Sequence, residues 1–554
     1  MPRDWNRRDA LIGLLGLPAV LAGCRGRDST EAEFDGRIVG PSLELGHRIR
    51  DGLRITPAND AWEKTGIVIV GGGVAGLSAA WRLLKADCED FVLLELERAA
   101  GGTAQSGTSP AGVSVSTPFP WGAHYIPAPT RENAALIKLL SEMSILEGSD
   151  ADREPIVAEQ FLCRDPQERI FYRGHWHEGL YLHAGASADD LAQYGRFQDE
   201  INRWVAWRDG RGRRAFGIPI VSASDDPEVR ALDKLSMADW LAEHSFISPR
   251  LCWLVDYACR DDYGLTVGQT SAWAGLFYFA SRIVRSGAEP RPLITWPEGN
   301  GRLVAHLSAG LARQARLGMA AIEVIPVERD GRSSVDIVAL SQDGRTARGF
   351  RAERVIFAAP QFIARHVVRP YRDDPPRHLS EFQYGTWLVA NVFLRNRPAE
   401  RGFPLAWDNV VYESPSLGYV TATHQRGPES GPTALTYYYP FCDDNPRRAR
   451  ERLLDLDWRT CAELALADLA IPHPDVRPLV ERIDVMRWGH AMIRPVPGFI
   501  WGLHRPTAAQ PYRKIHFANT DLSGVALFEE AFYHGIRAAE EALLARGRRI
   551  ASYV

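Results

Sequence analysis

The sequence contains a strand, a glycine-rich turn and a helix in immediate succession. A β-branched run over residues 67–70 is followed by Gly71, Gly73 and Gly76 in G-x-G-x-x-G spacing, and a helical stretch begins at Leu77. In this pattern the first glycine permits a tight turn, the second lets the backbone approach a pyrophosphate, and the third lets the helix sit close to the strand. The free N–H groups and the dipole at the helix start would then bind the phosphates.

A second strand and an acidic residue complete this unit. The apolar run over residues 91–94 ends on Glu95, which lies 24 residues beyond Gly71. A carboxylate at this place accepts hydrogen bonds from the ribose hydroxyls of an adenosine. A glycine turn alone is weak support, but strand, turn, helix, strand and acid together predict an α/β fold that begins with a Rossmann-like βαβ unit.

A second glycine pair, Gly101-Gly102, follows in the stretch ELERAAGGTAQSG. This stretch resembles the signature that follows the ribose-binding acid in FAD enzymes of the flavin-containing amine oxidase superfamily, which includes protoporphyrinogen oxidases and carotenoid desaturases. Thr103 stands where that family usually has Arg. The resemblance implies FAD as the cofactor, and a Rossmann-like FAD-binding domain with a parallel sheet, interleaved with an α+β substrate domain.

Later segments extend the resemblance and imply further contacts with FAD. Gly122 and Ala123 are kept from a family segment that packs near the flavin. The strand that ends at Val327 corresponds to one whose backbone contacts the adenine. The stretch KIHFANTD and the helix after it resemble the closing FAD motif, which implies that Asp521 accepts from a ribityl hydroxyl. The helix start near Phe528 would present N–H groups to the pyrimidine edge of the flavin.

The resemblance divides the chain into interleaved parts. Residues 1–24 are predicted to be a signal and 25–62 a tether; residues 63–129, 291–360 and 491–554 are FAD-binding parts, 130–290 is a helical part of the substrate domain, and 361–490 is a β-rich part of it.

The catalytic residues are not identified by any motif. Candidates for the pocket are Trp488, in a strand that resembles one leading back to the cofactor, and His124, Trp273 and Tyr437. A lone His beside aromatic residues is more often structural, and the aromatic stretch that holds Trp273 is by default a buried core helix. The resemblance covers the FAD-binding segments and carries no information on the substrate.

The N-terminus resembles an export signal. Arg7-Arg8 precede a short apolar run, as in twin-arginine signals. The run is too short to span a bilayer. Residues 21–24, LAGC, resemble a bacterial lipobox in which Cys24 becomes lipidated. These features predict a folded protein exported by the twin-arginine route, periplasmic or otherwise extracytoplasmic and held on a membrane by lipid. An uncleaved anchor or a chance apolar start is the alternative.

Composition narrows the function further. The net charge of −4 argues against a nucleic-acid surface. The seven cysteines contain no C-x-x-C and indicate neither a disulfide framework nor a metal site. Many amine oxidases of the superfamily hold a water against flavin N5 with a lysine from the substrate domain. This chain has no lysine between Lys234 and Lys514, so we expect no lysine in that role.

The sequence thus predicts an FAD-dependent oxidase, dehydrogenase or desaturase that takes a hydride from a C–N or C–C bond of a small substrate. O₂ or a membrane quinone would accept the electrons. An apolar or aromatic substrate is favoured, because a small polyamine would require carboxylates or a cation–π cage. Amine oxidation proper is an alternative. A different class is an exported flavoprotein that carries electrons or a binding lipoprotein without turnover.

Overall fold

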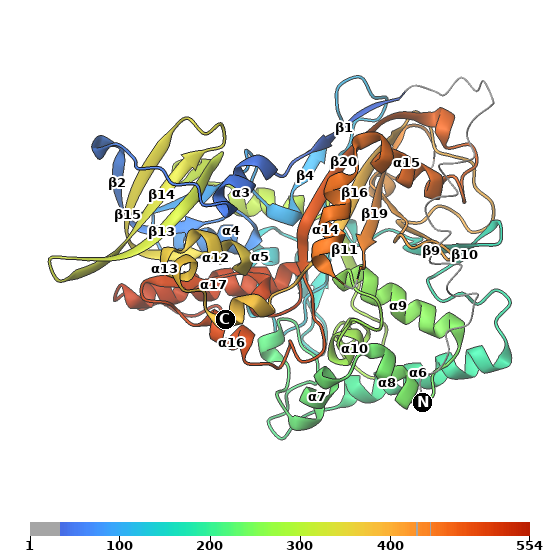
Figure 1. The fold of residues 1–554 in the computed structure, drawn as a ribbon. Helices are drawn as coiled ribbons and strands as arrows, with labels where there is room; N and C mark the ends of the chain where they lie inside the picture. The colour runs from blue at the N-terminus through green and yellow to red at the C-terminus, as the bar shows by residue number, and fades with distance from the viewer. Residues whose placement is uncertain (1–33, 428–429, 444) are drawn as a thin grey trace, which may run out of the picture. The chain divides into compact units, whose positions relative to one another are not determined.

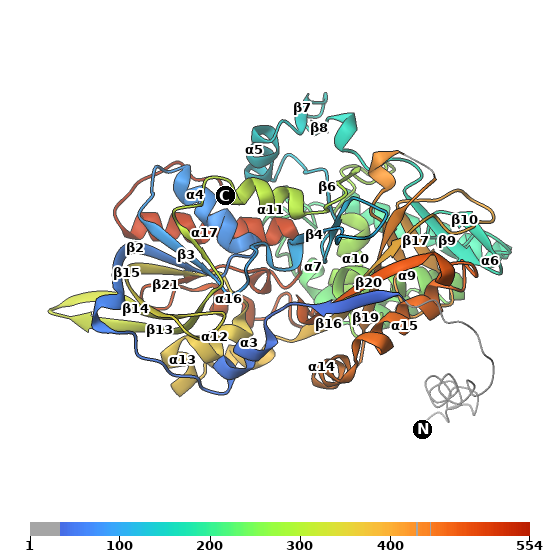
Figure 2. The same ribbon diagram turned by 90° about the horizontal axis from the view of Figure 1, so that it is seen from above.

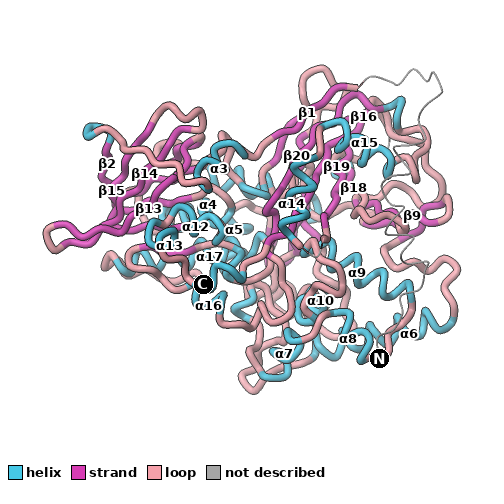
Figure 3. Tube along the Cα trace, viewed as in Figure 1, coloured by secondary structure: helices cyan, strands magenta, loops and turns pink. Residues whose placement is uncertain are grey.

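The computed structural model describes residues 34–427, 430–443 and 445–554. The twin-arginine pair, Cys24 and the first part of the expected tether lie outside the described residues. Residues 36–554 form one unit built on two large sheets, with helices grouped around each (Figures 1 and 3). Within the described residues, no helix has the length and apolar character needed to cross a membrane.

The first sheet is the predicted nucleotide-binding sheet. Its seven strands run in the order β12-β3-β2-β15-β14-β13, with β21 paired to β15. Strands β3, β2, β15 and β21 are parallel, so their carboxyl ends meet at one edge, where ligands bind in open α/β sheets. The strands are β2 (Trp62–Val70), β3 (Phe91–Glu95), β12 (Ala315–Leu317), β13 (Met319–Arg329), β14 (Arg332–Ser341), β15 (Ala347–Phe357) and β21 (Ile515–Phe517).

Alternate residues of β2 enter two different cores, as the two-residue period of a strand requires. Ile67 and Ile69 pack with helices α4 and α17, whereas Val68 and Val70 pack with α12, α13 and the β13–β14 side of the sheet. Figure 2 shows the two sets of helices on opposite faces of the sheet. These helices are α4 (Val74–Leu84), α17 (Phe528–Ala545), α12 (Gln361–Val367) and α13 (Arg369–Asp373).

Two glycines allow the close packing around α4. A Cβ added at Gly76 would lie 1.9 Å from the Gly71 carbonyl oxygen, and one at Gly535 of α17 would lie 2.2 Å from the Ala75 carbonyl oxygen. Helix α4 therefore sits directly against the strand end on one side and against α17 on the other. This confirms the packing role predicted for Gly76.

The second sheet is mainly antiparallel and contains the strands expected in the β-rich part of the substrate domain. Its order is β1-β20-β16-β19-β18-β17-β9-β10. The strands are β1 (Asp35–Val39), β9 (Glu168–Tyr172), β10 (His175–Glu178), β16 (Tyr384–Leu394), β17 (Asp408–Val411), β18 (Tyr419–Thr421), β19 (Thr433–Phe441) and β20 (Val480–Ile493). Strands of the two sheets alternate along the chain, which confirms the interleaved α/β and α+β architecture.

A group of helices with its own aromatic core lies in the part of the chain expected to complete the substrate domain. They are α6 (Ala188–Ala206), α8 (Met237–Glu243), α9 (Pro249–Tyr263) and α10 (Ala272–Ala280). Residues 130–290 are less uniformly helical than predicted, because they also contain β7 (Leu146–Ser149), β8 (Pro155–Val157), β9 and β10. β9 pairs with the distant β17, a contact that local sequence patterns do not reveal.

The described part of residues 25–62 is folded, in contrast to the predicted tether. It contains β1 and the helix α3 (Leu43–Arg50). Leu45 is 3% exposed and packs with Ile322 and Val338 on the first sheet. The physical reason is this apolar contact, which holds the segment on the surface of the first sheet.

The remaining elements connect these layers. They are α5 (Ala134–Glu142), α7 (Pro227–Ala231), α11 (Gly301–Ser308), α14 (Pro446–Asp455), α15 (Trp458–Leu469), α16 (His504–Ala509), β4 (Ser106–Thr108), β5 (Pro118–Pro120), β6 (Tyr125–Pro127) and β11 (Leu293–Thr295).

Candidate active site

The glycine turn forms an open cradle at the end of β2. Gly71 has a φ of 102°, which L side chains rarely adopt. Gly73 precedes α4, and a Cβ added there would have only the Gly102 Cα within 4.0 Å. The Gly101 N–H donates to the Gly72 carbonyl at 2.8 Å, so the two glycine segments lie side by side. This leaves backbone, space and a helix start where a pyrophosphate is expected.

Glu95 lies beside this cradle at the end of β3. One carboxylate oxygen accepts from the Gly72 N–H at 2.6 Å, and the other accepts from the Glu97 N–H at 2.7 Å. Burial raises the pKa of Glu95, and these two hydrogen bonds oppose the rise. Each oxygen keeps a further lone pair, so the predicted contact with ribose hydroxyls is compatible with this geometry.

Asp521 follows β21 and is fully enclosed. Its Oδ2 accepts from the Gln361 N–H at 2.7 Å and from the Tyr384 hydroxyl at 2.6 Å. Burial raises the pKa of Asp521 to about 6. Oδ2 is thus bonded to the start of α12 and to β16. Sequence reasoning found neither Gln361 nor Tyr384, because they come from other segments of the chain.

Val327 does not lie where the adenine contact was expected. It pairs with Ser334 in the β13–β14 hairpin, whereas the strand beside Glu95 is β12, with Leu317 opposite Glu95. Gly318, at a φ of 70°, ends β12 and turns the chain into β13. The prediction treated the later strand as the one beside the nucleotide and is wrong on this point.

Gly122 and Ala123 pack on the second glycine pair. A Cβ at Gly122 would lie 2.3 Å from the Thr103 carbonyl oxygen, so this close approach requires glycine. The Ala123 N–H donates to the same oxygen at 3.0 Å. Phe528 is buried at the start of α17, in the same core as α4. All these segments lie along the edge where the parallel strands end.

Aromatic rings surround His124, which directly follows this segment. The centroid of its ring lies 5.2 Å from that of Tyr125, 5.2 Å from that of Trp407 and 5.0 Å from that of Tyr438. Burial lowers the pKa of His124 to about 4, so its imidazole is neutral near pH 7. The Trp488 indole N–H donates to the Trp121 carbonyl at 2.7 Å, which ties this segment to β20.

Three carboxyl groups meet beside these rings: Glu168 of β9, Asp261 of α9 and Asp408 of β17. Burial raises the pKa of all three, and the charges of Glu168 and Asp261 raise that of Asp408 further. The Tyr257 hydroxyl donates to Asp408 Oδ2 at 3.3 Å. The charges of Asp408 and Asp261 also raise the pKa of Tyr438, after the larger effect of burial. The carboxyls and the rings are therefore neighbours.

We call this set the acidic–aromatic cluster: His124, Tyr125, Glu168, Tyr257, Asp261, Asp262, Tyr278, Arg282, Trp407, Asp408 and Tyr438. His124, Tyr125 and the three unpaired carboxyls keep part of their accessible surface, although burial dominates their pKa shifts. The cluster draws on β6, β9, β17, β19, α9 and α10, and no motif in the sequence marks it.

Arg282 is the cation within this cluster. It lies 3.3 Å from Asp262 Oδ2 and donates to the Tyr125 hydroxyl at 3.1 Å. Its guanidinium also lies over the rings of Tyr125 and Tyr278. Among the described residues, no ion pair of 4.0 Å or less joins Glu168, Asp261 or Asp408 to a basic side chain. One cation thus stands against four carboxyl groups.

Glu529 connects the cluster to the cofactor edge. It follows Phe528 in the first turn of α17 and is 3% exposed. Burial raises its pKa to about 7, and the charges of Arg282 and Asp262 act on it. The charges of Arg282 and Asp262 therefore reach the helix start that was predicted to face the flavin.

The other predicted residues lie elsewhere. Trp273 is fully buried in the core of the helical group, against Phe216 and Phe277. Tyr437 lies on the face of β19 opposite Tyr438, where the charge of Asp468 acts on it. Lys234 is exposed in a 3₁₀ turn. Of the four candidates for the pocket, the structure brings only His124 and Trp488 together.

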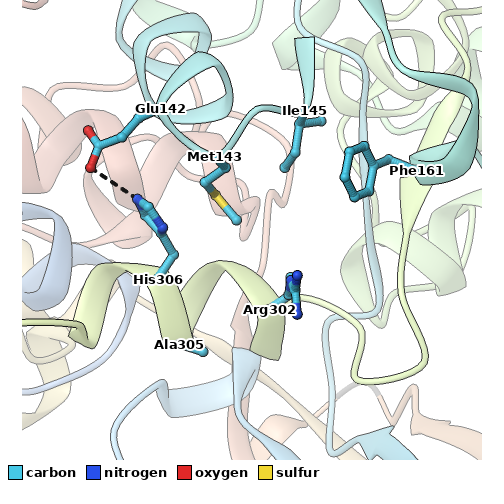
Figure 4. Close-up of a pocket in the computed structure, with 7 residues that line it drawn as sticks. All are labelled: Glu142, Met143, Ile145, Phe161, Arg302, Ala305 and His306. Carbon is cyan, nitrogen blue, oxygen red and sulfur yellow. Dashed lines mark hydrogen bonds and ion pairs between the residues drawn. The ribbon is translucent and has the colours of Figure 1, made fainter.

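A separate surface pocket of about 350 Å³ lies between α5 and α11 (Figure 4). Its lining residues are Glu142, Met143, Ile145, Phe161, Arg302, Ala305 and His306. His306 Nε2 lies 3.2 Å from Glu142 Oε1. None of the predicted cofactor or substrate residues lines it, so we do not assign it to the reaction.

A family model decides the relationship. The model of the flavin containing amine oxidoreductases matches residues 74–543. The chain belongs to this family. It is therefore an FAD-dependent oxidoreductase, as the glycine motifs predicted.

Solved structures share the fold. Putrescine oxidase bound to putrescine has a TM-score of 0.62 at 17% identity, over 87% of this chain and 100% of that chain. Cyclohexylamine oxidase from Brevibacterium oxydans IH-35A gives 0.59 at 15% identity, over 88% and 100%. A putative protoporphyrinogen oxidase from Exiguobacterium sp. 255-15 gives 0.56 at 14% identity, over 88% and 100%. No curated protein matches the sequence.

The residues of this chain fit FAD. The space over Gly73 is a cradle that a Cβ would fill, and Glu95 stands beside it. At the same edge, the side-chain amide of Gln361 is buried without a hydrogen-bond partner among the described residues. Glu95 would hold the adenosine ribose and the α4 start the pyrophosphate. The α17 start would hold the flavin end.

Proposed function

We propose that this flavoprotein oxidises a C–N bond of an amine that carries a positive charge in water. The observation that carries the proposal is the acidic–aromatic cluster, where Glu168, Asp261 and Asp408 lie beside aromatic rings. Binding of an amine would require carboxylates or a cation–π cage, and the sequence patterns had shown neither. The proposal therefore departs from the apolar substrate that the sequence favoured.

The electrostatics support a cationic ligand. Burying several carboxylates near one another is unfavourable unless cations compensate them. Arg282 compensates Asp262, and Glu168, Asp261 and Asp408 remain. An ammonium group bound among them would supply the missing charge, and the faces of Tyr125, Trp407 and Tyr438 would attract it further. Putrescine oxidase and cyclohexylamine oxidase, which share this fold, are named for amine substrates.

The residues then have defined roles in the reaction. Bound FAD supplies an acceptor for a hydride. The carboxylates bind the ammonium form, and one of them takes its proton, so that the nitrogen lone pair can assist loss of hydride from the adjacent carbon. The C–N bond becomes C=N, and water converts this product to a carbonyl compound and ammonia, or an amine where the nitrogen carries a second carbon. His124, neutral near pH 7, adds no charge that would repel the substrate.

Anaerobic reduction of the flavin tests the proposal. We expect diamines and arylalkyl monoamines to bleach the flavin absorbance at rates that saturate with concentration, and alcohols of the same carbon skeleton to leave it unchanged. Reduction by an uncharged alicyclic substrate, with no response to amines, would instead support desaturation of a C–C bond. A flavin that is reduced only by an external electron donor would indicate an electron carrier.

The electron acceptor is proposed to be O₂ or a membrane quinone. Re-oxidation of the amine-reduced protein is followed by absorbance, first in air and then anaerobically with a soluble quinone. Formation of hydrogen peroxide in step with amine consumption assigns O₂.

We also infer that the protein leaves the cytoplasm folded and is held on a membrane by lipid at Cys24. The support is the order of Arg7-Arg8, the apolar run and the LAGC stretch. Replacing both arginines, Arg7→Lys with Arg8→Lys, is expected to keep the protein in the cytoplasm, measured by cell fractionation. Cys24→Ser should release it from the membrane fraction. If it stays there with unchanged processing, the lipid anchor is refuted.

A further inference from the structure

The buried side chain of Gln361 has no hydrogen-bond partner among the described residues. Gln361 begins α12 directly after β15 and is 1% exposed. Neither Oε1 nor Nε2 has a hydrogen-bond partner among the described residues. Each buried polar group left unpaired costs free energy, and native proteins rarely leave both ends of an amide so. The arrangement indicates that a ligand completes it.

The position of Gln361 in the sheet indicates which part of FAD would lie beside its side chain. The parallel strands follow one another as β3, β2, β15 and β21, about 4.8 Å apart. Glu95 ends β3 and the glycine turn ends β2. The next strand end, at β15, leads to Gln361, and Ala359 lies against the turn, with its nitrogen 3.1 Å from a Cβ added at Gly71. FAD runs from adenosine through pyrophosphate to the ribityl chain, so its third part falls at β15.

We propose that the side-chain amide of Gln361 binds hydroxyl groups of the FAD ribityl chain. The inference rests on the FAD cofactor of the family, not on the amine substrate. The amide offers two N–H donors and one carbonyl acceptor. A phosphate has only acceptors and would leave Oε1 unpaired, whereas a hydroxyl both donates and accepts. Ribityl hydroxyls can therefore satisfy both ends of the amide.

Asp521 and Tyr384 are positioning residues in this assignment. The Asp521 carboxylate accepts from the backbone N–H of Gln361 and from the Tyr384 hydroxyl, so it fixes where α12 begins. Phe362 adds a second constraint, because its ring stacks on His490 of β20 with centroids 4.1 Å apart. Gln361 therefore lies beside the residue to which the sequence assigned the ribityl contact.

Binding of FAD to the full chain freed of its cofactor tests the proposal. Gln361→Leu keeps the volume of the side chain and removes its unpaired polar groups. We expect this variant to raise the Kd for FAD by about 10- to 100-fold and to unfold at an equal or higher temperature when FAD is absent. A purely structural glutamine would give the opposite change in stability. Gln510→Leu, at an exposed position, is the control.

Deoxyribityl analogues of FAD, each lacking one hydroxyl, locate the contact. For at least one analogue, the Kd for the wild type should be higher than the Kd of FAD for the wild type. For Gln361→Leu, the Kd of the same analogue should equal the Kd of FAD for that variant. Gln361→Glu keeps an acceptor, so its Kd for FAD should lie between the values of the wild type and Gln361→Leu. An unchanged Kd for FAD in Gln361→Leu would overturn the proposal. Equal losses with every analogue in both proteins would also overturn it, and would assign Gln361 to another part of the cofactor.

Discussion

Gly73→Val yields a folded protein that does not retain FAD. A Cβ at this position meets nothing closer than the Gly102 Cα at 4.0 Å, so the empty site tolerates the substitution. The valine methyl groups would occupy the space where the pyrophosphate approaches the N-terminus of α4. Losing two or three hydrogen bonds to a charged phosphate, at about 1.5–3 kcal/mol each, weakens binding by about two to six orders of magnitude.

The measurement is the ratio of flavin to protein after purification, with thermal unfolding to verify the fold. Gly195→Val is the matched control, because a Cβ at Gly195 has no neighbour within 4 Å and the residue lies in α6, far along the chain. Gly76→Val differs from both, since its Cβ would lie 1.9 Å from the Gly71 carbonyl and would disrupt the fold itself. Full FAD loading in Gly73→Val would exclude the cradle as the pyrophosphate site.

Asp261→Asn lowers kcat/KM for a cationic amine by about 150- to 5000-fold, because truncating one partner of a buried charge pair costs about 3–5 kcal/mol. The substitution preserves shape and removes one negative charge from the acidic–aromatic cluster. Asp199→Asn is the control, because it makes the same chemical change at an exposed position of α6.

Lys234→Met tests whether a lysine acts at flavin N5. Lys234 is exposed, so we expect flavin reduction to be unchanged in this variant.

The pH dependence of kcat/KM, compared between the wild type and Asp261→Asn, gives a second test of the same role. Burial and the charge of Asp262 raise the pKa of Asp261, so the carboxyl is neutral at pH values where an ordinary Asp is charged. Binding an ammonium requires the charged form. In the wild type, kcat/KM should therefore rise with pH above the ordinary carboxyl range and fall again as the amine loses its proton near pH 10.

In Asp261→Asn the acidic limb should move to lower pH. The charge of Asp261 contributes to the raised pKa of Asp408, and its removal lets Asp408 ionise more readily. An unshifted limb, or an equal loss of kcat/KM for an uncharged substrate, would show that Asp261 does not bind the ammonium.

The cofactor half of the site was predictable because its chemistry is local. Gly71, Gly73, Gly76 and Glu95 lie within one βαβ unit, where the turn, the helix start and the strand end are dictated by neighbouring residues. The error at Val327 arose where this locality ended. A single turn at Gly318 separates β12, which pairs with β3, from β13, and pairing between distant strands carries no local signature.

The acidic–aromatic cluster, which we propose binds the substrate, was decided by tertiary structure. Glu168 and Asp408 are 240 residues apart in the chain, yet they face each other because β9 and β17 pair in register. The sequence placed Tyr437 and Tyr438 on opposite faces of one strand, as the period of a strand requires, but not which face meets the cofactor. Local periodicity determines which residues share a face. Only the packing of distant elements determines which residues contact that face. Here this packing placed the carboxyl groups of the acidic–aromatic cluster beside the face that carries Tyr438.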